Sequence, residues 1–252
     1  MPAPLLLPLA VAALLTVAHP PAEAGEELLR RMNAAHRDRW FTTLIFEQRT
    51  TFPGSSRPEE TWYETMERPG KLRLDMMRGD SLIGRTIFRG DSIYQSMGGR
   101  PAVARALVHP LLVLLHDVHV GPVDPVLAKL RALGFDLAKT RADIWQGRPV
   151  TVVGAAAGDT LSRQFWVDDR DLVVVRILQP GASGARSDTQ VGGFSREGDA
   201  LVEREIRFFT NGTETLREEY VWVRTGVPIE ASAFDPTSSG MPAWVTERRR
   251  RQ

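Results

Sequence analysis

The sequence contains no cysteine, so disulfide bonds, thiol nucleophiles and thiolate metal sites are excluded, as is N-terminal lipidation at a cysteine. It also lacks a Gly-x-Ser-x-Gly elbow, a Walker loop and a glycine-rich dinucleotide fingerprint. Adjacent carboxylates such as Glu218 and Glu219 would face opposite sides of a strand and could not share one acid–base site. We therefore expect no enzyme and no cofactor.

A strong charge excess and a long hydrophobic run are missing as well. The net charge is +1, which favours no polyanionic partner such as nucleic acid. The apolar stretch at residues 5–18 is shorter than the ~20 residues of a membrane span, and Ala22-Glu23-Ala24 has the small-x-small pattern of a signal peptidase site. We expect residues 1–24 to be a signal peptide, cut between Ala24 and Gly25, and the mature protein to be exported. An uncut membrane anchor is the alternative, because no Lys or Arg precedes the apolar run.

Histidines are few, but His109, His116 and His119 lie close together, with Asp117 beside them. Neutral imidazoles and carboxylates suit Zn²⁺. The spacing matches no metal-binding motif, and a proline and a glycine interrupt the segment. We therefore interpret these histidines as structural and predict no metal site.

Strand patterns are abundant. Side chains alternate between two faces along residues 62–97, and turn signals at 69–70, 78–80 and 89–91 divide this stretch into four antiparallel strands. More strand patterns follow between residues 135 and 225, without the strand–helix rhythm of a parallel sheet. Lys71, Arg73 and Asp75 fall on the face opposite the apolar one, which we expect to face water.

Two regions have the pattern of helices. Residues 25–39 carry an apolar stripe, and residues 101–134 contain the wholly apolar segment 111–115 and a last helix capped by Asp124. We predict an α+β fold in which a large curved antiparallel sheet, an incomplete β-barrel, wraps around the N-terminal helix and a short helical lid.

The mature chain is long enough for one domain with a sizeable core, which we place at residues 25–236. Residues 237–252 have the composition of an irregular basic tail, ending in the arginine run 248–251.

An apolar sheet face can be packed solid or left open to a ligand. Methionines are adaptable and suit a variable, chain-like guest. The bulky side chains that we expect to face such a hollow are Trp62, Met66, Leu72, Leu74, Met76, Ile87, Tyr94 and Trp222. The residues alone do not decide between a packed core and a cavity.

Short motifs within this sheet resemble the outer-membrane lipoprotein carrier family (LolA-like, LolB-like fold). They are, in order, Arg68-Pro69-Gly70, Leu72-Arg73-Leu74, the turn Gly90-Asp91 and Ile93-Tyr94. The resemblance implies a soluble periplasmic monomer that shields acyl chains of a lipoprotein or lipid in an apolar cavity during transfer to the outer membrane. It also implies inner- and outer-membrane partners that load and unload the carrier.

The same resemblance gives Arg68 the role of reaching the lid and holding the empty cavity shut. The lid would be region 101–134, with Leu111, Leu112 and Leu115 facing the ligand. Glu67 departs from the family, in which a basic residue is common at that position. Two alternatives stay open: a lipid-sensing or protein-interaction domain of the same fold, and a packed β-domain without a ligand.

Overall fold

The structure is a computed structural model that describes residues 23–251. The expected signal peptide at residues 1–24 therefore lies outside the described residues except for its last two positions. Within the described range, no helix is long and apolar enough to cross a membrane.

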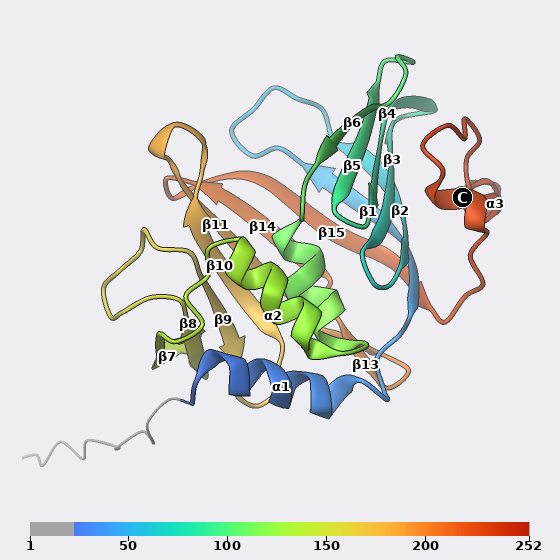
Figure 1. Cartoon of the computed structure of the whole chain (residues 1–252). Coiled ribbons are helices and arrows are strands. Elements are labelled where there is room, and N and C mark those ends of the chain that lie inside the picture. The colour runs from blue at the N-terminus through green and yellow to red at the C-terminus, as the bar shows by residue number, and fades with distance from the viewer. Residues whose placement is uncertain (1–22, 252) are drawn as a thin grey trace, which may run out of the picture.

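A strongly curved sheet of thirteen antiparallel strands dominates the molecule (Figure 1). Its order is β6-β5-β4-β3-β2-β1-β15-β14-β11-β10-β9-β8-β7, so β6 and β7 are free edges and the barrel stays open. The strands are β1 (Thr43–Thr51), β2 (Glu60–Glu67), β3 (Lys71–Arg78), β4 (Ser81–Arg89), β5 (Ser92–Met97), β6 (Val103–Ala106), β7 (Thr140–Trp145), β8 (Arg148–Val153), β9 (Gln164–Asp168), β10 (Val174–Pro180), β11 (Arg186–Gly192), β14 (Glu205–Thr210) and β15 (Thr213–Thr225). The predicted incomplete barrel is confirmed.

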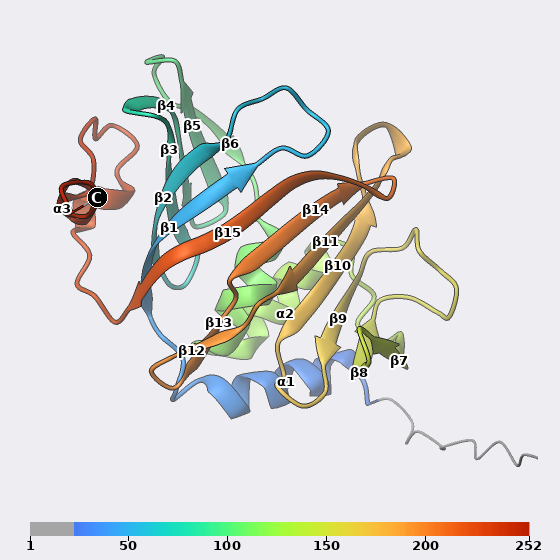
Figure 2. The ribbon, with the colours of Figure 1, turned by 180° about the vertical axis from the view of Figure 1, so that it is seen from behind.

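Long-range pairing joins the two halves of the sheet. Strand β15 lies between β1 and β14, so the last long strand lies beside the first (Figure 2). A small hairpin of β12 (Ser195–Glu197) and β13 (Ala200–Val202) completes the strands. The four strands predicted between residues 62 and 97 form as a meander, because each turn signal closes a hairpin.

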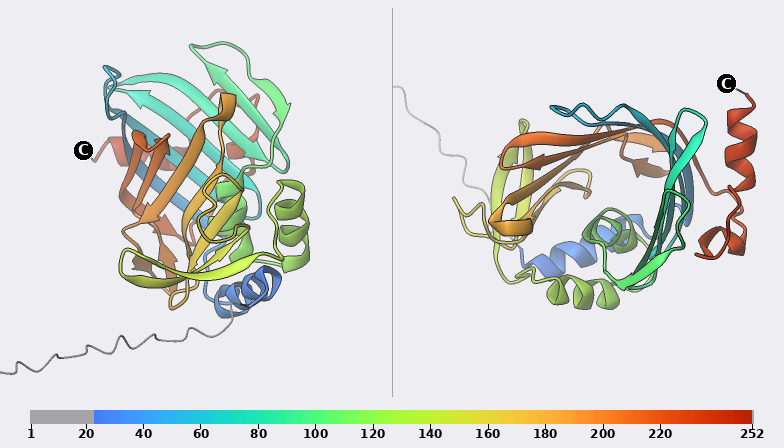
Figure 3. Two further views of the ribbon diagram at one scale, coloured as in Figure 1. Left: turned by 90° about the vertical axis from the view of Figure 1, so that its left-hand side faces the viewer. Right: turned by 90° about the horizontal axis from the view of Figure 1, so that it is seen from above.

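Helices close the open side of the curved sheet (Figure 3). They are α1 (Gly25–His36), the π-helix η1 (Leu112–His116), the 3-10 helix η2 (Asp117–His119) and α2 (Val123–Ala132). Leu28, Leu29 and Met32 of α1 are fully buried against the core. The 3-10 turn η3 (Ala182–Gly184) lies between β10 and β11.

The predicted helical region 101–134 is wrong at its start, because residues 103–106 add the edge strand β6 to the meander. The expected cap is also displaced. Pro122 occupies the N-cap of α2, and Asp124 lies in the first turn, where its carboxylate accepts a hydrogen bond from Arg30 at 2.6 Å.

The C-terminal segment folds back onto the convex face of the sheet (Figures 1 and 3). It contains the 3-10 helix η4 (Ala231–Phe234) and helix α3 (Ala243–Arg249), so the expected irregular tail includes a regular helix. This segment covers Arg73 and Asp75, which are 1% and 0% exposed and do not face water as expected. Charged residues at alternate positions resemble a solvated face, and the sequence does not reveal that a segment 160 residues later will cover them.

Candidate ligand-binding cavity

A partly open cavity of about 620 Å³ lies between the concave face of the sheet and η1. Pockets that hold small molecules have volumes of roughly 300–1,000 Å³. Its lining residues are Phe46, Arg57, Trp62, Glu64, Met66, Leu72, Leu74, Met76, Thr86, Phe88, Ile93, Gln95, Met97, Arg105, Leu107, His109, Leu111, Leu112, Leu115, His116, Ile206, Phe208, Leu216, Glu218 and Tyr220.

The apolar wall follows from the register of the meander. Met66 pairs with Leu72, Leu72 with Phe88 and Phe88 with Ile93, so four apolar side chains from four strands point to the same side. The facing surface of η1 and the residue before it add leucines to the opposite side of the cavity. An acyl chain placed between them would contact apolar groups on both sides.

Eight of the twelve predicted site residues line this cavity. They are Trp62, Met66, Leu72, Leu74, Met76, Leu111, Leu112 and Leu115. Strand alternation and the apolar run at 111–115 were sufficient signals for them, because both patterns fix which side chains face inward.

Ile87, Tyr94 and Trp222 lie on the convex face instead, and their expected inward position is wrong. Ile87 and Tyr94 pack in a cluster with η4, and Trp222 stacks on Trp244 with ring centroids 5.8 Å apart. A shift of one position moves a strand residue to the other face. The neighbouring Phe88 and Ile93 occupy the inward positions.

Arg68 does not line the cavity but links the lid to the sheet. Its guanidinium donates one hydrogen bond to the carbonyl of His116 at 2.8 Å and another to the carbonyl of Phe41, and it lies 4.0 Å over the Phe41 ring. The side chain is 8% exposed, and burial lowers the pKa of Arg68 to about 9, so the group stays charged at neutral pH. The role of holding the cavity shut, which the resemblance gives to Arg68, stays a prediction.

Further polar contacts fix the same end of the lid. The backbone N–H of Gly70 donates to the Asp117 carboxylate at 3.0 Å. Asn33 of α1 donates to the carbonyls of Val118 and Gly121 at 2.9 and 3.1 Å. The helical lid is thus held by polar bonds at the last residue of η1 and in η2, whereas the η1 leucines contact the cavity only through apolar groups.

The three histidines singled out from the sequence lie in different local environments. His116 lies with Nε2 3.2 Å from the Glu203 carboxylate, His119 packs on Trp40 at 4.0 Å, and His109 meets Phe88 edge-on at 5.0 Å. Burial lowers the pKa of His109 to about 4 and that of His119 well below its ordinary value. Within residues 23–251 there is no group of three or more side chains that could hold a metal ion.

Two acidic residues lie among the lining residues that were not predicted from the sequence. Glu64 and Glu218 bring carboxyl groups into an otherwise largely apolar wall. Burial raises the pKa of Glu218 to about 8 and that of Glu64 well above its ordinary value. Glu64 could have been found from the sequence, because period-two alternation places it on the same face of the strand as Trp62 and Met66.

No family model matches the sequence, and no curated protein matches it. Solved structures resemble it in fold. A domain from Vibrio parahaemolyticus described as an outer membrane lipoprotein-sorting protein aligns over 84% of this chain and 96% of its own, with a TM-score of 0.57 and 10% identity. The chain has the fold of the LolA superfamily.

Two further structures agree with this LolA-like fold. A LolA superfamily protein from Nitrosomonas europaea aligns over 82% of this chain and 96% of its own, with a TM-score of 0.52 and 10% identity. A DUF1329 family protein from Desulfovibrio piger aligns over 86% of this chain and 98% of its own, with a TM-score of 0.56 and 10% identity. The architecture implied by the Arg-Pro-Gly and Gly-Asp motifs is therefore confirmed.

Proposed function

We propose that this protein is a periplasmic carrier that binds acyl chains of lipids or lipoproteins in its cavity and shields them during transfer towards the outer membrane. The observation that carries the proposal is the apolar cavity of about 620 Å³ between the LolA-like sheet and η1. Each methylene group that leaves water for such a surface contributes ~0.8 kcal/mol. A packed β-domain without a ligand is disfavoured, because its core would fill this space.

The lid supports binding followed by release. Arg68 and Asp117 hold the junction of η1 and η2 to the sheet through a few polar bonds, so the lid can move once these bonds break. Partners in the inner and outer membranes would load and unload the carrier. A lipid-sensing domain would use the same cavity. It would differ from a carrier in having a protein partner that binds either the empty or the lipid-filled form, but not both.

A fluorescent acyl probe, whose emission rises in apolar surroundings, tests the cavity directly. Thr86 lines it and is 6% exposed, so Thr86→Phe places a ring inside the space for the ligand. We expect the wild-type protein to bind the probe with one site and Thr86→Phe to bind at least tenfold more weakly.

Val221→Phe is the matched control, because Val221 lies on a strand of the same sheet and is 54% exposed. It should bind the probe like the wild type. Equal binding by the wild type and Thr86→Phe, or no saturable binding at all, would rule out the cavity as the acyl-chain site.

A further inference from the structure

One wall of the cavity carries a pair of carboxyl groups in the middle of the sheet. Glu64 comes from β2 and Glu218 from β15, the two strands that flank β1. Both side chains line the cavity, next to Phe46 and Tyr220, whose rings stack at 4.1 Å. An acyl chain in the cavity would therefore meet two acidic groups.

These carboxyl groups have no cation from the protein. Glu64 is 5% exposed, and its side chain takes part in no hydrogen bond or ion pair within residues 23–251. Glu218 interacts with Gln48 and, in the described part of the chain, has no ion pair. Buried polar groups are nearly always paired, so an unpaired carboxyl that points into a cavity suggests a missing partner.

Neighbouring groups give an independent indication. Nδ1 of His116, which also lines the cavity and is 3% exposed, has no hydrogen-bond partner among the described residues. Oε1 of Gln48, beside Glu218, is buried and also lacks a partner there. A purely hydrocarbon guest would leave all of these atoms unsatisfied.

Two cationic groups near the cavity are already engaged, and a third, Arg105 of the edge strand β6, donates to Gln95 at 3.2 Å. Arg68 binds the carbonyls of Phe41 and His116, and the guanidinium of Arg57 is bound by the Glu60 carboxylate at 2.8 and 3.0 Å. Burial and the nearby carboxylates hold the pKa of Glu64 above its ordinary value, which is the effect expected when no cation compensates them.

The site therefore lacks a positive charge with several donors. An ammonium group has three donors and no acceptor, which matches two carboxyl groups in an apolar wall. An ionised phosphate or carboxylate would find no counter-charge there. We propose, building on the carrier function above, that Glu64 and Glu218 bind the primary ammonium group of an amphiphile whose acyl chain occupies the rest of the cavity.

Competition against the fluorescent acyl probe tests the proposed ammonium site. The three competing ligands have equal chain length: dodecylamine, dodecanol and dodecanoate. We expect the wild type to bind dodecylamine at least tenfold more tightly than dodecanol, and dodecanoate more weakly than either. In the double variant Glu64→Gln/Glu218→Gln the amine-to-alcohol ratio should fall below twofold. Circular dichroism verifies that the variant is folded.

Glu219→Gln is the matched control, because it makes the same chemical change one residue away, where Glu219 pairs with Arg49 on the surface. Its amine preference should equal that of the wild type. Two sources of the ammonium group are separated by comparing lysophosphatidylethanolamine with a lysine-containing lipopeptide, each against its N-acetylated form. The one that loses more affinity on acetylation is the source, and no loss for either overturns the proposal.

The remaining outcomes separate the two proposals. Equal binding of dodecylamine and dodecanol to the wild type overturns the ammonium site but keeps the acyl-chain cavity. An amine preference that persists in the double variant overturns its assignment to Glu64 and Glu218. Failure of all three ligands to displace the probe contradicts the carrier function itself.

Discussion

At the scale of single residues, the arginine at the lid and the glutamates in the cavity wall have opposite energetic roles. Arg68 is buried with two carbonyl acceptors for its charge, whereas Glu64 and Glu218 are in the wall without a cation. The first arrangement joins the end of η1 to the segment before β1. The unpaired carboxyl groups reduce the stability of the empty protein, and a ligand that pairs with them can offset this cost.

Arg68→Leu should accelerate release of the acyl probe about tenfold, because losing about 1.4 kcal/mol of net hydrogen bonding to the lid corresponds to that factor. The melting temperature should change little, since an apolar side chain removes the cost of a buried charge together with its bonds. Stopped-flow dissociation and thermal unfolding measure the two effects. Arg89→Leu, an exposed change at the end of β4, should alter neither, and an unchanged release rate in Arg68→Leu would argue against the lid role.

The glutamates predict a pH dependence of stability. The pKa of Glu218 is about 8 in the folded protein and ordinary in the unfolded chain, so the unfolded chain ionises first as pH rises. The stabilising effect of the neutral carboxyl is therefore complete below about pH 4.5 and is lost as pH rises to about 8. The other charged or ionisable groups that face the same region are Glu64, Glu203, His116, Tyr220 and Arg68.

Glu218→Gln should therefore melt at a higher temperature than the wild type at pH 8 and at nearly the same temperature at pH 5. A gain of about 1–2 kcal/mol corresponds to about 2–8 °C for a chain of this size. Differential scanning calorimetry at pH 5 and at pH 8 measures these melting temperatures. Glu219→Gln should show no such difference, and a lower melting temperature for Glu218→Gln at pH 8 would refute the assigned pKa shift.

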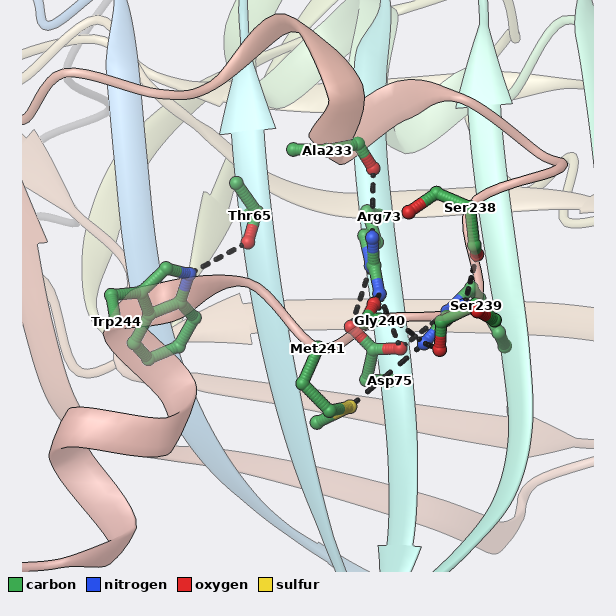
Figure 4. A network of polar contacts seen from close by, with 10 residues as sticks. Thr65, Arg73, Asp75, Ala233, Ser238, Ser239, Gly240, Met241 and Trp244 are labelled. Atoms are coloured by element: carbon green, nitrogen blue, oxygen red, sulfur yellow. Dashed lines mark hydrogen bonds and ion pairs between the residues drawn. The ribbon is translucent and has the colours of Figure 1, made fainter.

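At the scale of elements, the C-terminal segment is fixed to the convex face by a buried charge network (Figure 4). The Asp75 carboxylate accepts hydrogen bonds from Arg73 at 2.6 Å and from Arg85 at 2.6 Å. The two guanidiniums in turn donate to carbonyls of the segment, including those of Ala233 at 3.1 Å and Gly240 at 3.1 Å. One carboxylate thus orients two cations, and the segment supplies their other acceptors.

Asp75→Asn should destabilise the protein by about 3–5 kcal/mol, because it leaves two buried guanidiniums without their counter-charge. Urea unfolding followed by circular dichroism measures this loss. Asp80→Asn is a matched control, since Asp80 pairs with Arg249 of the same segment at a fully exposed position and should have little effect. Equal, small losses in both variants would show that the buried network does not hold the segment.

At the scale of the whole molecule, local patterns predicted the meander, the curved sheet and most of the apolar wall. Met66 and Leu72 were predictable because period-two alternation fixes their face. Ile87 and Tyr94 were not, because the residues next to them, Phe88 and Ile93, are also apolar and either register fits the pattern. The amphipathic signals of β4 and β5 are therefore ambiguous by one position.

Features that depend on distant segments escaped prediction. The burial of Arg73 depends on contacts with residues beyond 230, and no local pattern encodes them. The inward direction of Glu64 was predictable, but its lack of a partner depends on side chains from β15 and the lid. Cavity volume likewise arises only when all lining residues come together.

The most direct test of the central claim is the content of the cavity when the protein is isolated from a bacterial periplasm. The purified protein is denatured, extracted with organic solvent, and the extract is analysed by mass spectrometry alongside that of Thr86→Phe. We predict about one acyl-chain molecule per wild-type protein and much less from the variant. A lipid-free extract from the wild type, from protein that also fails to bind the acyl probe, would contradict the carrier function.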